Sequence, residues 1–251
     1  MVKGLNIFRD HFQNYAGQYM LIGGTACSVL MDEAEVDFRV TKDLDIVLCA
    51  EALTDDFFRA FWAFVKDGGY QIRQKSDGRP QLYRFSKPTD SRYPGMLEIF
   101  SRKPNFVTSD DVHLAPIPTD SEVYSLSAIL LDDAYYDLVK TGAITIDGIT
   151  VVSANYLIPM KIRAYIDLST RRAAGERIDA EAVQKHKKDV LRLMNIADNI
   201  GRIALPGTML QDVSAFISIM REERPVLRDI GIKEISLDDM LENLAIMYVY
   251  T

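Results

Sequence analysis

Two aspartates stand two positions apart in the stretch RVTKDLDIVL, residues 39–48, which otherwise has the pattern of a β-strand. Alternate residues of a strand point to the same face, so Asp43 and Asp45 are expected to lie side by side with Arg39 and Thr41. Two carboxylates at that spacing repel each other, and partial burial increases the penalty. A bound cation would neutralise them, and so would ion pairs with Arg39 or a lysine on an exposed edge strand.

Glu98 supplies a third acid, between Leu97 and Ile99 in the apolar stretch GMLEIFS. A carboxylate in such a stretch needs an ion-pair partner, solvent on one face or a bound cation. If its strand lies beside residues 39–48, three hard oxygen ligands meet at one end of a sheet. Mg²⁺ prefers such ligands, and two ions about 4 Å apart can activate a hydroxyl and stabilise a leaving pyrophosphate. Two rival acid pairs are Asp110-Asp111 in a predicted loop and Asp132-Asp133 at a predicted helix start, which the helix dipole explains.

A glycine pair precedes these acids in the stretch YMLIGGT, where a strand-like run breaks at Gly23 and Gly24 and a helix is predicted from Thr25. Glycines allow close backbone approach, and a helix N-terminus offers free N–H groups to an anion such as phosphate. Thr25 can cap the helix or bind a phosphate; the alternative is a tight turn with a threonine cap and no ligand. The stretch matches neither the dinucleotide-binding nor the P-loop glycine pattern.

Short strand-like runs dominate the chain up to about residue 153 and must position these residues. The strands are predicted at 19–24, 39–48, 70–74, 81–86, 95–101 and 123–131, with an amphipathic helix at 55–66 and a hairpin turning at Asp147-Gly148. The rest reads as helical, near 154–174, 179–199, 206–223 and 237–249. The predicted fold is therefore an α/β (α+β) domain at 1–153, with a mixed sheet flanked by helices, followed by a helical domain at 154–251.

Composition excludes several other classes of protein. The 251 residues are 48% hydrophobic, and no apolar run approaches the roughly 18 residues of a membrane span. The polar N-terminus does not resemble a secretory signal, so a cytoplasmic protein without membrane association is expected. Cys27 and Cys49 read as reduced buried thiols, and with three scattered histidines they form no zinc pattern. The net charge of −7 argues against a generally basic nucleic-acid binder but leaves a local basic surface possible.

The glycine pair, the following helix and the pattern R-x-T-x-D-x-D together resemble the polymerase-β-type nucleotidyltransferase fold, and within it the AbiEii/MenT-like toxin family. The resemblance implies transfer of a nucleoside monophosphate from an NTP to an acceptor hydroxyl, with two Mg²⁺ ions on Asp43, Asp45 and Glu98. It implies a tRNA 3′ end, a protein side chain or a small molecule as acceptor, and a cognate antitoxin as a possible partner. The nucleotide-binding residues it implies are Gly23, Gly24, Thr25, Arg39, Thr41, Lys161 and His186.

The helical half carries a second, weaker match. The stretches KIRAYIDLSTRR, from Lys161, and KHKKDVLRL, from Lys185, resemble the family's lysine-containing helix and its later basic-Asp motif. The resemblance implies that Lys161 contacts the nucleotide phosphates and that Asp189 helps to arrange the catalytic site. The alternative is a set of solvated helix faces with Asp189 in local ion pairs, and His186 as a surface residue. A run such as KHKK could contact RNA phosphates only over a small area.

Two functions therefore compete. The first is an active Mg²⁺-dependent nucleotidyltransferase, and the second is a catalytically inactive protein of the same fold that binds a nucleotide or a partner. The retained acids favour the active enzyme, because an inactive protein has no physical need to keep repelling carboxylates together.

Overall fold

The computed structural model describes residues 2–74, 80–102, 114–117, 126–198 and 201–250. The chain divides into two compact units. The sheet unit comprises Met1–Glu33 and Phe38–Ser153, and the helical unit comprises Ala34–Asp37 and Ala154–Thr251.

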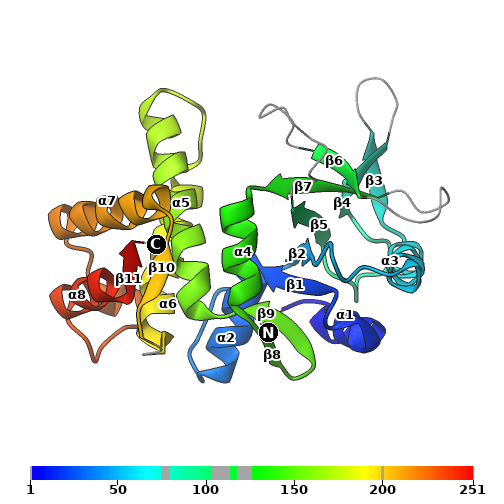
Figure 1. The fold of residues 1–251 in the computed structure, drawn as a ribbon, viewed down its shortest axis with the longest axis horizontal. Coiled ribbons are helices and arrows are strands. Elements are labelled where there is room, and N and C mark those ends of the chain that lie inside the picture. Colours follow the sequence, from blue (N-terminus) through cyan, green and yellow to red (C-terminus); the bar gives the residue numbers. More distant parts are fainter. Residues whose placement is uncertain (1, 75–79, 103–113, 118–125, 199–200, 251) are drawn as a thin grey trace. The chain divides into compact units, whose positions relative to one another are not determined.

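The sheet unit is a mixed sheet flanked by helices, which confirms the predicted α/β class (Figure 1). Within the described residues, strands follow the order β3-β4-β5-β2-β1-β9-β8, and β7 pairs with β5 and β6. The pairs β2–β5, β5–β7 and β1–β9 are parallel, and the other pairs are antiparallel. The strands are β1 (Tyr19–Ile22), β2 (Asp43–Leu48), β3 (Gln71–Gln74), β4 (Pro80–Ser86), β5 (Met96–Arg102), β6 (Leu114–Ile117), β7 (Leu126–Leu131), β8 (Ala143–Ile146) and β9 (Ile149–Val152). The helices are α1 (Leu5–Phe12), η1 (Gln13–Tyr15), α2 (Gly23–Glu33), α3 (Asp55–Asp67) and α4 (Asp133–Thr141).

Aromatic side chains of α3 pack against one face of this sheet. Helix α3 begins after Thr54, whose side chain accepts a hydrogen bond from the Phe57 N–H, and it buries one row of phenylalanines. The Phe61 ring lies 5.4 Å from that of Phe85 on β4, and Phe85 is the register partner of Leu97 on β5. The same sheet face carries the buried residues Leu44, Ile46 and Leu48 of β2, and Leu97 and Ile99 of β5. The aspartates of β2 alternate with these leucines and isoleucines, so they emerge from the opposite face.

Most predicted elements of the sheet unit are present. The predicted helix at 55–66 is α3, and the predicted hairpin is β8–β9, where Asp147 and Gly148 both adopt positive φ as a two-residue turn requires. The strand expected over 39–48 begins only at Asp43. Its pairing with β5 begins at Asp43 and Met96, and its pairing with β1 extends no further than Asp45 and Ile22, so residues 39–42 have no partner strand among the described residues. Asp132 lies at a helix start, as predicted, and caps α4: its side chain accepts a hydrogen bond from the Tyr135 N–H. The other acid pair, Asp110-Asp111, lies outside the described residues.

The helical unit contains α5 (Ala154–Ala173), α6 (Ala180–Ile196), α7 (Gly207–Glu223), η2 (Leu227–Ile230) and α8 (Leu237–Met247). The expectation that everything beyond residue 153 is helical is wrong in one respect. Strands β10 (Ile203–Leu205) and β11 (Tyr248–Tyr250) form a parallel two-stranded sheet. Three residues are too few to show a strand period, and the helix predicted from the sequence extends to residue 249, into β11. Among the described residues, no helix is both long and apolar enough to span a membrane.

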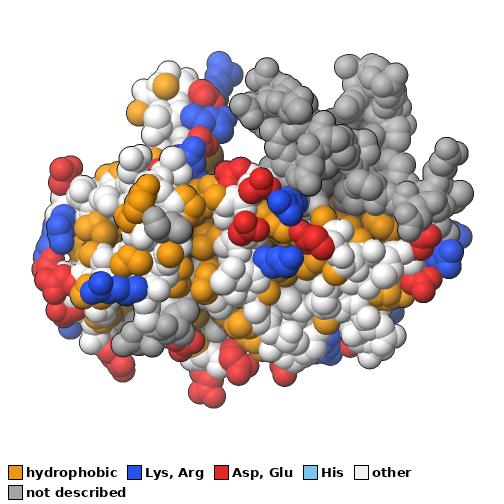
Figure 2. Space-filling model, in the orientation of Figure 1, with side chains coloured by type: hydrophobic (Ala, Val, Ile, Leu, Met, Phe, Trp, Pro, Cys, Tyr) orange, Lys and Arg blue, Asp and Glu red, His pale blue; other side chains and the backbone are white. Residues whose placement is uncertain are grey.

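Two composition-based expectations can be compared with the structure. Cys27 and Cys49 are buried free thiols, as predicted. On the face drawn in Figure 2, lysine and arginine side chains lie interspersed with aspartate and glutamate, so the coloured residues there form no continuous basic surface.

Candidate active site at the start of β2

The three predicted acids emerge from one face of two neighbouring strands. In the parallel pair β2–β5, Asp45 is the register partner of Glu98, and Asp43 is the partner of Met96. Register partners point to the same face, so Asp43, Asp45 and Glu98 share the face opposite the aromatic core. Asp43 is exposed, whereas Asp45 and Glu98 are partly buried. The fold therefore supplies the juxtaposition on which the predicted carboxylate site depends.

Glu98 already has a cation partner, Arg84. This arginine is the register partner of Glu98 on β4 and shares its face. Arg84 donates from Nε to Oε1 of Glu98 at 2.8 Å and from Nη2 to the same oxygen. The hydrogen bond to Glu98 raises the pKa of the Arg84 guanidinium above its usual value, and the nearby negative charge of Asp45 adds to that rise. Within the described residues, no three acidic, histidine or cysteine side chains are grouped as a metal site would require.

Gly23 brings the start of α2 against Asp45. Its φ of +66° lies in the left-handed region that favours glycine, and a Cβ built on it would lie 1.9 Å from Oδ2 of Asp45. The preceding residue, Ile22, is the register partner of Asp45, so the chain enters the helix beside this carboxylate. The contact requires glycine for two independent reasons. It places Asp45 at the N-terminus of α2, where the first backbone N–H groups have no partner within the helix.

Gly24, Arg39 and Thr41 form a second group at the same helix start. A Cβ on Gly24 would lie 3.1 Å from Nη2 of Arg39 and 3.3 Å from Oγ1 of Thr41. Thr41 is 7% exposed, and its hydroxyl has no hydrogen-bond partner among the described residues. A buried hydroxyl in that state carries a desolvation penalty that a bound ligand could relieve. Arg39 and Thr41 thus reach the helix start from the irregular segment before β2, not from a shared strand face.

Thr25 has a structural partner. It is completely buried, and its hydroxyl donates to the backbone carbonyl of Asp43 at 2.6 Å. The hydroxyl proton is therefore donated to the backbone, and the predicted phosphate contact of Thr25 stays a prediction. In this geometry Thr25 ties α2 to the first residue of β2 and so positions Asp43.

Lys161 and Asp189 belong to the helical unit, where they form an ion pair between α5 and α6. Lys161 Nζ lies 2.9 Å from Oδ2 of Asp189, and their side chains are 7% and 0% exposed. The alternative of a solvated lysine face is therefore wrong for Lys161, and Asp189 pairs with it across the two helices. His186 is partly buried on α6. The predicted contacts of Lys161 and His186 with a nucleotide stay predictions.

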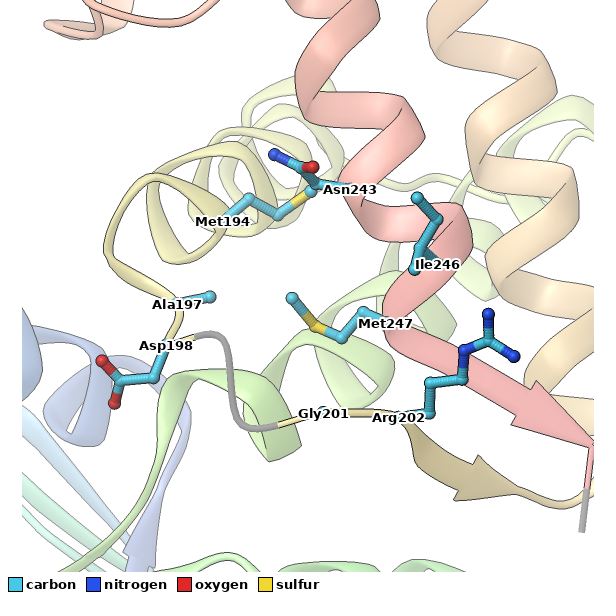
Figure 3. Close-up of a pocket in the computed structure, with 8 residues that line it drawn as sticks. All are labelled: Met194, Ala197, Asp198, Gly201, Arg202, Asn243, Ile246 and Met247. Atoms are coloured by element: carbon cyan, nitrogen blue, oxygen red, sulfur yellow. The ribbon is translucent and has the colours of Figure 1, made fainter.

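The helical unit also contains a cavity of about 470 Å³ (Figure 3). The side chains of Met194, Ala197 and Met247 turn toward its interior, and the Asp198 carboxylate turns away. None of the residues predicted from the sequence lines this cavity.

Comparison with known proteins adds little to this picture. No family model matches the chain, and no curated protein matches it. Among solved structures, an antigenic nucleotidyltransferase-like protein from Paracoccidioides brasiliensis shares 16% identity over 96% of this chain and 99% of its own, with a TM-score of 0.45. The Megavirus polyadenylate synthase shares 14% identity over 87% of this chain and 36% of its own, with a TM-score of 0.40. These scores are too low to establish a shared fold or activity.

Proposed function

We propose that the protein is a Mg²⁺-dependent nucleotidyltransferase that moves a nucleoside monophosphate from an NTP to an acceptor hydroxyl and releases pyrophosphate. One observation carries the proposal. Asp43, Asp45 and Glu98 share a sheet face, and the glycine start of α2 lies directly against Asp45. Acids for a metal and a helix N-terminus for a phosphate are the two components that this reaction needs in one place.

The three acids offer Mg²⁺ the ligands it prefers, because all of them are carboxylate oxygens. Asp43 is exposed to solvent. Asp43 and Asp45 would hold the metal, and Glu98 would join them after release from Arg84. When bound, Mg²⁺ supplies positive charge that acidifies the acceptor hydroxyl and stabilises the leaving pyrophosphate. Glu98 would favour loss of the hydroxyl proton.

The triphosphate fits the helix start. The N–H groups that follow Gly23 and Gly24 would bind phosphate oxygens, and the Arg39 guanidinium and Thr41 hydroxyl would add donors beside Gly24. Thr25 would hold Asp43 in place through its backbone. The phosphate contact of Lys161 and the arranging role of Asp189 stay implications of the family resemblance.

The acceptor and the biological role follow from the same resemblance. We propose a tRNA 3′ end or a protein side chain as acceptor, and action as the toxin of a toxin–antitoxin pair. Incubation with each α-labelled NTP, Mg²⁺ and total RNA or lysate tests this, because the molecule that becomes labelled identifies the acceptor.

Substitution of the aspartates tests the site itself. Asp43→Asn and Asp45→Asn should each abolish transfer, and the metal-free fold should keep or gain stability because charge repulsion falls. Asp137→Asn, on the exposed side of α4, is the matched control and should leave transfer unchanged. Full transfer by the Asp45→Asn variant would refute the site, and a large loss of stability in both variants would instead support structural ion pairs.

The ion pair of Glu98 favours a second candidate, a nucleotide-binding protein without catalysis. An acid that stays bound to Arg84 cannot serve a metal, while the helix start keeps its phosphate donors. Calorimetry that detects NTP binding, combined with no pyrophosphate release in the presence of total RNA and lysate, would favour this candidate.

A further inference from the structure

Arg84, Glu98 and Asp45 form a charged row across three adjacent strands. Arg84 on β4 is the register partner of Glu98 on β5, which is the register partner of Asp45 on β2. The strand registers therefore place the positive side chain of Arg84 on the face that carries the three acids. The nucleotidyltransferase proposal above requires Glu98 to leave this arginine but gives the arginine no role of its own.

We propose that Arg84 is the internal cation of this site: it holds Glu98 while no metal is bound, and a divalent ion binds by displacing it. This inference rests on the proposed function. Two observations support it. The Nε and Nη2 donors of the guanidinium converge on one oxygen of Glu98, and in this arrangement the described acids are not grouped for a metal. The metal site is therefore complete only after Glu98 leaves Arg84.

The burial of the two partners shows which of them can move. The Arg84 side chain is 34% exposed, whereas that of Glu98 is 13% exposed. The guanidinium can thus turn into solvent and stay hydrated, while the carboxylate stays on the sheet face. A divalent ion also neutralises more of the three negative charges than a single guanidinium can. Replacement of Arg84 by a divalent ion is therefore electrostatically favourable. The ion pair between Arg84 and Glu98 must first break, and the free energy of that step weakens the apparent metal affinity.

Metal titration of the full chain without nucleotide tests this exchange. A partly exposed ion pair is worth up to about 1 kcal/mol, so Arg84→Gln should tighten Mg²⁺ binding by up to about fivefold in calorimetry. Mn²⁺ should show the same change. The melting temperature of the metal-free variant should fall, and Mg²⁺ should raise it by more than it raises that of the wild type. Arg92→Gln is the matched control, because Arg92 pairs with Asp90 in an exposed loop and should leave metal affinity unchanged.

Each other outcome has a distinct meaning. Unchanged affinity in Arg84→Gln would overturn the exchange, and weaker binding would show that Arg84 positions Glu98 for the metal instead. If Arg84→Gln does not fold, Arg84→Lys keeps the charge but loses the double hydrogen bond, and its affinity should rise by a smaller factor. If only the exchange is wrong, Asp45→Asn should still abolish Mg²⁺ binding. If Mg²⁺ binding survives Asp45→Asn, the proposed metal site itself is wrong.

Discussion

Gly23→Ala is the substitution whose effect follows most directly from the geometry of the site. The new methyl group would lie 1.9 Å from Oδ2 of Asp45 and 2.9 Å from its Cγ, both far below contact distance. Relief requires the Asp45 side chain or the start of α2 to move. Either movement separates the carboxylate from the helix start, so the substitution should damage stability and activity together.

Two terms set the loss of stability. Left-handed backbone costs a non-glycine residue about 1–2 kcal/mol. Pushing the Asp45 side chain off its rotamer adds about 0.5–1.5 kcal/mol. Gly23→Ala should therefore lower the free energy of unfolding by about 1.5–3.5 kcal/mol. A catalytic group displaced by about 1 Å loses about 100-fold in rate, and the transfer rate should fall by that factor or more.

Urea denaturation and the rate of NTP-dependent labelling measure the two effects. Gly175→Ala is the matched control, because Gly175 has a φ of +93° but nothing within 4 Å of its Cβ position. It should show the backbone cost alone and full transfer. In an Asp45→Ala background the clashing oxygen is gone, so the effect of Gly23→Ala should approach that of the control. A Gly23→Ala variant that matches Gly175→Ala in both stability and transfer would refute the close contact.

Three further predictions concern other parts of the structure. Thr41→Val removes a buried hydroxyl without a partner among the described residues, so unfolding measurements should show unchanged or slightly higher stability. Its NTP affinity should nevertheless fall in calorimetry, and an unchanged affinity would remove Thr41 from the site. Lys161→Met leaves Asp189 buried and should lower stability by about 3–5 kcal/mol, which added Asp189→Leu should largely restore; a loss below about 1 kcal/mol would contradict a tight pair. Burial raises the pKa of the Cys49 thiol to about 11, so it should stay protonated at pH 8 and react with a disulfide reagent only after unfolding. Rapid labelling of Cys49 in the native protein at pH 8 would contradict this.

Local patterns predicted much of the sheet unit. The apolar period of α3, the Asp147-Gly148 turn and the alternation in β2 each depend on neighbours in the sequence, and the structure has all three. The start of β2 was predicted four residues too early, because strand length depends on where β1 and β5 end. The strands β10 and β11 were missed because a pair of three-residue strands is defined by pairing alone.

Long-range partners account for the rest of the difference. The strand that carries Arg84 was predicted, but its register with Glu98 depends on pairing that one sequence does not specify. For Lys161 the sequence offers a phosphate contact or a solvated face, yet its partner Asp189 is 28 residues away and both are buried. The convergence of Arg39 and Thr41 on Gly24 likewise depends on an irregular segment with no period to recognise.

The most direct test of the central claim is a single labelling experiment with an internal control. Wild-type protein and the Asp45→Asn variant are incubated with the four α-labelled NTPs, Mg²⁺ and total RNA or lysate, and labelled product and pyrophosphate are measured together. The wild type should transfer label and release equimolar pyrophosphate, and the variant should do neither. No transfer by the folded wild type, or equal transfer by the variant, would contradict the claim that the acids at the start of β2 catalyse nucleotidyl transfer.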